Sequence, residues 1–144
     1  MFLQLERQFA LFDLQYFPLV IVKLKKLNNI SEFALFLKQW EQLYNYGKKF
    51  TLLIDARNLK NTGLKCGILA SNFIKKLRKK NPQYLENSIL IYNSKFVKYL
   101  FSFILSFENP VSPTYLYYTK EKGLINYIEI FKIKDENKLM KIYN

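Results

Sequence analysis

The stretch that most constrains the fold is 50–77, where a short, largely apolar run passes through a polar turn into an amphipathic segment. The run FTLLID at 50–55 is typical of a strand buried on both faces, and it ends on a carboxylate. After the turn, apolar residues recur at i, i+3, i+4, i+7, i+8 and i+11, beginning at Cys66. That spacing predicts the buried face of an α-helix, so this stretch reads as one strand–helix unit of an α/β fold.

The same alternation continues through the rest of the chain. Strands are predicted at 2–14, 19–24, 50–55, 88–92 and 114–118, and helices at 31–47, 63–80, 95–107 and 120–131. The first two strands are close enough in sequence to form a hairpin, which we expect to be the one antiparallel element. The predicted fold class is α/β, with a mostly parallel or mixed sheet of about five strands sandwiched by helices, in the order β-β-α-β-α-β-α-β-α.

A chain of 144 residues is long enough for one domain with a real core. We place that domain at 1–131 and expect 132–144 to be a charged, loosely docked tail. The N-terminus lacks the uninterrupted apolar run of a signal peptide, and no window reaches the roughly 18 apolar residues of a membrane span. We therefore expect no transmembrane segment and a cytoplasmic location.

The formal net charge of +12 raises the question of nucleic-acid binding. Arginine, the preferred reader of phosphates and bases, occurs only at Arg7, Arg57 and Arg78. The chain is also rich in Lys, Asn, Ile, Tyr and Phe, and a genome biased toward AT-rich codons would produce such a composition without selection for a polyanion. We therefore do not expect a nucleic-acid partner, and we interpret the basic run at 75–80 as a solvated face.

The chain has one cysteine, Cys66, and no histidine. This excludes a disulfide within the monomer, a Cys-based metal site and the usual general base. Neither of the glycine-rich phosphate-binding patterns is present, and no close pair of carboxylates lies at a strand end. We expect Cys66 to be a small buried side chain, and we expect a protein that is not an enzyme and has no metal or cofactor.

The turn at 55–63, DARNLKNTG, is the first candidate for a functional site, because ligands and partners of open α/β sheets gather at the carboxyl ends of strands. Its candidate residues are Asp55, Arg57, Asn61, Thr62 and Gly63. A purely structural interpretation is also open. In it, Thr62 caps the following helix and Asp55 orders the turn.

This turn and the strand before it resemble the strand–turn–helix signature of STAS domains, the family of sulfate-transporter and anti-sigma-factor-antagonist domains. The whole run 33–128 resembles the SpoIIAA-like branch over about two-thirds of the chain. The shared features are a helix ending in W-x(6)-G, a strand ending in Asp, a helix with an Asn-Pro break, a strand ending near Asn-Ser, and a final P-T-x-L-Y strand. The order of elements is also similar to that of the lipid-binding CRAL-TRIO (Sec14-like) fold.

The STAS resemblance implies a non-catalytic regulatory module that works by protein–protein contact. In classical anti-sigma antagonists the pattern is Asp-Ser-Ser-Gly, and a partner kinase phosphorylates the serine before the glycine. Carried over by position, Thr62 would be the phospho-acceptor. Lys60 and Asn61 occupy the acidic and first serine positions here, so the chain departs from the pattern.

The segment 95–107, KFVKYLFSFILSF, is the second candidate, because it predicts a helix that is apolar on nearly every side. Phe96, Val97, Leu100 and Ile104 can face the sheet, which leaves a second set for interaction: Lys95, Lys98, Phe101, Phe103, Leu105 and Phe107. We expect this helix to contact a protein partner or a second copy of the chain. The alternatives are a lipid- or membrane-surface-binding module, in which the lysines reach anionic headgroups, and an ordinary core helix.

Overall fold

The computed structural model describes residues 8–60, 62–134 and 140–142. Its elements are β1 (Ala10–Asp13), β2 (Leu19–Leu24), α2 (Ile30–Gln42), the 3₁₀ helix η1 (Leu43–Tyr46), β3 (Phe50–Asp55), α3 (Leu64–Arg78), β4 (Leu85–Tyr92), α4 (Lys95–Phe107), β5 (Thr114–Tyr118), α5 (Tyr127–Lys134) and β6 (Met140–Ile142). The predicted α/β class and the predicted order of strands and helices are confirmed. The structure adds η1 and a short sixth strand.

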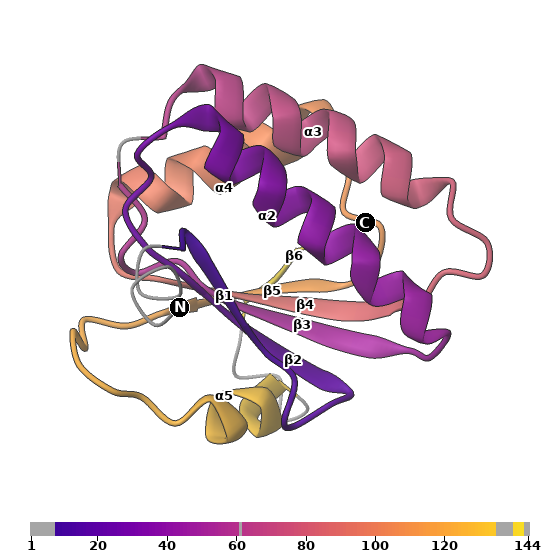
Figure 1. Cartoon of the computed structure of the whole chain (residues 1–144). Coiled ribbons are helices and arrows are strands. Elements are labelled where there is room, and N and C mark those ends of the chain that lie inside the picture. Colours follow the sequence, from indigo (N-terminus) through magenta and orange to yellow (C-terminus); the bar gives the residue numbers. More distant parts are fainter. Residues whose placement is uncertain (1–7, 61, 135–139, 143–144) are drawn as a thin grey trace.

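The strands form one mixed sheet in the order β1-β2-β3-β4-β5-β6. Strands β2 to β5 are parallel, and the edge strands β1 and β6 are antiparallel to their neighbours. Because each parallel strand is added on the same side of the previous one, right-handed crossovers place their connecting helices on the same face. Helices α2, α3 and α4 therefore cover one face together, whereas α5 lies alone on the other (Figure 1). The predicted arrangement of helices on both faces of the sheet is therefore strongly asymmetric, with three helices on one face and one on the other.

The central strands are apolar on both faces because each face has its own core. All six residues of β3 are buried. Phe50, Leu52 and Ile54 belong to the large core under the three helices. Leu53 points the other way, into a smaller core that includes Ile130 of α5. This is the burial that a continuous apolar strand requires in a parallel sheet.

Three helix ends have recognisable stop or start signals. The N-cap of α2 is Asn29, two residues before the predicted start of this helix: its side chain accepts from the Glu32 N–H at 3.2 Å, and the Glu32 carboxylate accepts from the Asn29 N–H at 3.2 Å. This reciprocal pair is a capping box. Ser94 caps α4, with its side-chain oxygen accepting from the Val97 N–H at 3.2 Å. Gly47, with φ of 65°, ends η1 in the left-handed conformation.

The last helix begins later than predicted. Helix was expected over 120–131, but α5 starts at Tyr127, after an irregular segment at 119–126. Gly123 disfavours helix there, and Asn126 begins α5 by accepting from the Glu129 N–H at 3.2 Å. Beyond the domain boundary that we placed at 131, α5 continues to Lys134, and 140–142 pair with β5 as β6. Residues 135–139 and 143–144 of the expected tail lie outside the described residues.

In the three described ranges, no helix has the length and apolar character that a membrane crossing requires.

Candidate functional site

Asp55 and Arg57 of the predicted turn form a buried ion pair at the carboxyl end of β3. The Arg57 side chain folds back onto the carboxylate, with Nε donating to Oδ1 at 2.9 Å and Nη2 donating to Oδ2 at 2.8 Å. The Arg57 backbone N–H also donates to Oδ1, at 3.2 Å. Both side chains are 8% exposed. Asp55 therefore orders the turn, which is the structural role that the sequence left open.

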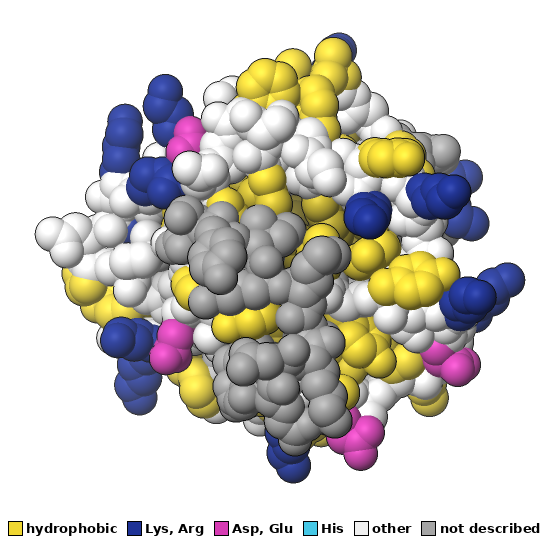
Figure 2. Space-filling model, turned by 180° about the vertical axis from the view of Figure 1, so that it is seen from behind, with side chains coloured by type: hydrophobic (Ala, Val, Ile, Leu, Met, Phe, Trp, Pro, Cys, Tyr) yellow, Lys and Arg dark blue, Asp and Glu magenta, His cyan; other side chains and the backbone are white. Residues whose placement is uncertain are grey.

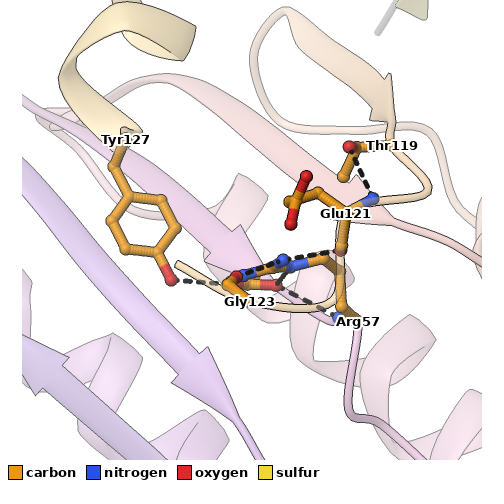
Figure 3. A network of polar contacts seen from close by, with 6 residues as sticks. Arg57, Thr119, Glu121, Gly123 and Tyr127 are labelled. Carbon is orange, nitrogen blue, oxygen red and sulfur yellow. Dashed lines mark hydrogen bonds and ion pairs between the residues drawn. The ribbon is translucent and has the colours of Figure 1, made fainter. Parts of the chain in front are cut away.

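The pair is joined to the far end of the chain by Tyr127, the first residue of α5. Its hydroxyl donates to Asp55 Oδ2 at 2.6 Å. Arg57 Nη1 donates to the carbonyl oxygens of Glu121 and Gly123, each at 2.8 Å. Figure 3 shows the tyrosine reaching the pair from one side and the segment with Thr119, Glu121 and Gly123 from the other. The network thus ties the turn after β3 to the connection between β5 and α5.

The charges of this network are fixed at neutral pH. Burial raises the pKa of Asp55, but the hydrogen bonds from Arg57 and Tyr127 outweigh burial and hold that pKa below its usual value. The hydrogen bond to Asp55 raises the pKa of Arg57. Burial, together with the neighbouring carboxylate, raises the pKa of Tyr127. A proton acceptor with a lowered pKa and donors with raised ones are poorly suited to proton transfer, so the arrangement supports a structural lock rather than acid–base chemistry.

Thr62 does not cap α3. The N-cap is Gly63, which offers no side-chain hydrogen bond, and the Thr62 side chain is buried instead. Its hydroxyl has no hydrogen-bond partner within the described part of the chain. Asn61 lies outside the described residues. Cys66, in the first turn of α3, is buried as expected, and burial raises the pKa of its thiol.

The residues predicted for interaction on α4 do not share one surface. Phe101 is buried toward the sheet, and Leu105 is half-buried. Phe103 lies against the backbone of α3, so close that a Cβ at Gly67 would be 2.5 Å from its ring. Lys95, Lys98 and Phe107 are exposed. The helix is therefore rotated relative to our expectation.

The rotation also contradicts our expectation for one residue at the start of α4. Phe96, expected to face the sheet, is 45% exposed. The reason is tertiary, because the small side of α3 at Gly67 accepts Phe103 and sets the rotation of α4.

Exposed apolar residues of α3 and α4 flank this contact. Leu64 lies on the same stripe of α3 as Gly67, at spacing i+3, and the Phe107 ring packs edge-on against the Phe103 ring, with centroids 4.9 Å apart. We define the α3–α4 patch as Leu64, Ile68, Phe96 and Phe107, whose exposed fractions run from 45% to 65%. The sequence analysis did not identify Leu64 and Ile68. Helical spacing shows which residues share a face, but it does not show whether a neighbouring helix covers that face.

A cavity lies between the sheet and the three helices that cover it. Its volume is about 100 Å³, and its walls are mainly apolar side chains from α2, α3, α4 and the strands beneath them. Trp40 of α2 and Ser112, which precedes β5, also line it. Trp40 Nε1 and Ser112 Oγ are buried and have no hydrogen-bond partner among the described residues.

Three cations of the basic run at the end of α3 pair with two carboxylates of the neighbouring helices. Lys76 and Lys80 each contact the Glu41 carboxylate of α2, at 3.2 Å and 3.1 Å, and Arg78 contacts Glu108 at 2.9 Å. Burial raises the pKa of Glu41, but the bonds from Lys80 and Lys76 outweigh it, so that pKa lies below its usual value. These cations join α3 to both neighbouring helices.

Comparisons of the chain with protein-family models, with curated proteins and with solved structures gave no match. The structure therefore shows an α/β domain with a mixed sheet and interleaved helices, and no family is identified.

Proposed function

We propose that this protein is a non-catalytic, cytoplasmic module of the STAS type, close to the SpoIIAA-like branch, that works by protein–protein contact. The observation that carries the proposal is the α3–α4 patch. Leu64 and Phe107 are 63% and 65% exposed, and covering the exposed part of each would be worth roughly 1–2 kcal/mol. Large side chains left exposed together mark interaction sites on soluble domains.

The partner that we propose is a second copy of the chain. In a two-fold dimer the same patch is buried on both copies, so its four residues count twice. If each gains roughly 1–2 kcal/mol, the eight side chains contribute about 8–16 kcal/mol, against an association cost of about 4–15 kcal/mol. The expected result is a weak, concentration-dependent dimer.

The charge around the patch gives this dimer a distinctive salt dependence. Lys65, Lys95 and Lys98 are exposed beside it, and the chain carries a net charge of +12. Figure 2 shows one face of the molecule, on which Lys and Arg side chains project on both sides of surface hydrophobic groups. Two such surfaces repel at low salt, so salt should strengthen the dimer by screening.

The test is light scattering on size-exclusion fractions, over a range of protein concentration and at low and high salt. We expect the wild type to shift toward dimer as concentration and salt rise. Phe107→Asp and Leu64→Asp should remain folded monomers, because both positions are exposed. The matched control is Leu35→Asp on α2, which is 51% exposed but outside the patch and should dimerise normally. A wild type that stays monomeric under all conditions overturns the proposed dimer.

The exposed lysines favour one second candidate, an anionic membrane surface. Aromatic and aliphatic groups flanked by lysines are typical of segments that lie in a membrane interface. Flotation with vesicles of anionic lipid separates the two, because membrane binding should weaken as salt rises whereas the dimer strengthens. Binding that is lost in Phe107→Asp but kept in Leu35→Asp would favour the membrane; no flotation of the wild type would reject it.

A further inference from the structure

Three connections lie together at the edge of the sheet where its parallel strands begin. β2, β3 and β4 are paired in parallel and start side by side. The connections that lead into them are 14–18, 47–49 and 79–84, and Figure 1 shows them at one end of the sheet. Neighbouring strands lie about 4.8 Å apart, so the three connections span about 10 Å.

This edge of the sheet is basic. Lys48, Lys49 and Lys79 are exposed, and none of the three forms an ion pair with the described residues. The three connections carry no Asp or Glu, and along the chain the nearest exposed carboxylate is Glu86, the second residue of β4. Unpaired cations gathered at one edge favour a partner that carries several negative charges.

Exposed aromatic rings lie at the same edge. Tyr46, the last residue of η1, is 56% exposed, and its ring packs against Phe17 with centroids 5.4 Å apart. Tyr16, which precedes Phe17, is 49% exposed. Gly47, in the left-handed conformation, turns the chain between Tyr46 and Lys48. Exposed rings among cations are the combination that binds single-stranded nucleic acids, because bases stack on the rings and phosphates contact the cations.

We propose that this amino-edge surface binds single-stranded nucleic acid without sequence preference. The surface is defined by Tyr16, Tyr46, Lys48, Lys49 and Lys79. The scarcity of arginine, from which we expected no nucleic-acid partner, concerns the reading of base edges. Stacking and contact with phosphates require only rings and cations, and lysine binds phosphate as a point charge. A duplex hides the faces of its bases, so the tyrosine rings select single strands. The surface shares no residue with the α3–α4 patch, and neither proposal requires the other.

Fluorescence anisotropy of a labelled oligothymidylate of about 15 nucleotides measures this binding, at salt concentrations from about 50 to 200 mM. The affinity of the wild type should fall as salt rises, because contacts with phosphates release counterions. The double variant Lys48→Gln/Lys49→Gln should reduce the slope of log affinity against log salt by about 1.4, since each phosphate contact of a single strand contributes about 0.7.

The tyrosines should act differently from the lysines. Tyr46→Ala should weaken the affinity about tenfold and leave the salt slope unchanged, because stacking releases no counterions, whereas Tyr46→Phe keeps the ring and should keep the affinity. Heparin, a polyanion without bases, should bind less tightly to the lysine variant but equally well to Tyr46→Ala. If thermal unfolding shows that Tyr46→Ala does not fold, Tyr16→Ala serves in its place.

The matched control is Lys120→Gln/Lys122→Gln. It removes the same charge from two exposed lysines after β5, at the opposite edge of the sheet, and should change the affinity by less than about twofold. Equal losses in the two lysine pairs, or no saturable binding of the wild type at the lowest salt, would overturn the proposal. A loss of heparin affinity in Tyr46→Ala would reject stacking. Binding to anionic vesicles without binding to the oligonucleotide would assign the surface to a membrane instead.

Discussion

The Asp55–Arg57–Tyr127 network makes the sharpest prediction about stability. Truncation of Asp55 to alanine removes the acceptor of four hydrogen bonds, two from the Arg57 guanidinium, one from its backbone N–H and one from the Tyr127 hydroxyl. Arg57 would keep only its two carbonyl acceptors, at 2.8 Å, and would remain buried without a counter-charge. Such a change is costly because the charge that is left behind is desolvated.

Breaking a buried ion pair in this way costs about 3–5 kcal/mol, a large share of the roughly 5–15 kcal/mol that stabilises a typical domain. Tyr127→Phe removes a single bond to a charged group, at 2.6 Å, and should cost about 1.5–3 kcal/mol. In the double variant the two losses should not add, because Tyr127 has no carboxylate to bond once Asp55 is gone.

Urea unfolding followed by far-ultraviolet circular dichroism at neutral pH measures these differences. With a typical urea dependence, Asp55→Ala should lower the midpoint by roughly 2 M. Glu86→Ala, which removes an exposed carboxylate from β4, is the matched control and should change the free energy of unfolding by less than about 0.5 kcal/mol. A loss below about 1 kcal/mol for Asp55→Ala would refute the reasoning that this network locks the two segments together.

Three further predictions rest on single groups. Because the folded pKa of Asp55 lies below its ordinary value of 3.8, its contribution to stability is complete above that value and is lost as the pH falls through the folded pKa. Urea midpoints below pH 3.8 should therefore fall more in the wild type than in Asp55→Asn, and parallel curves would contradict this. Gly67→Ala should destabilise the wild type, since its Cβ would lie 2.5 Å from the Phe103 ring, but should stabilise Phe103→Ala by up to about 1 kcal/mol through helix propensity; an equal effect in both backgrounds would argue against the clash. Cys66 is buried and its pKa is raised by burial, so a water-soluble thiol reagent should label it slowly in the native protein and fast in urea, and fast native labelling would show that the thiol is accessible.

The local pattern of the chain was enough to predict several elements with the bounds that the structure has. β2, β3, α4 and β5 are examples. Each is marked by an apolar period and by a start or stop signal within a few residues, such as Ser94 before α4. The last helix was misplaced because 119–126 is held in an irregular conformation by Arg57, more than sixty residues away in the chain. Local propensity does not include such a contact.

For the candidate site, the sequence determined that Asp55 and Arg57 would lie together at a strand end, because a strand that ends in a turn brings neighbouring residues to one edge of the sheet. Only the tertiary structure decided their role, by placing Tyr127 against them from 72 residues away. It also decided that Phe101 is buried whereas Phe96 is exposed, since the rotation of α4 is set by Phe103 against Gly67. The cavity beside Ser112 and Trp40 depends on tertiary packing as well. A sequence records which side chains are apolar, but the space between them is fixed only when three helices and a sheet pack on one another.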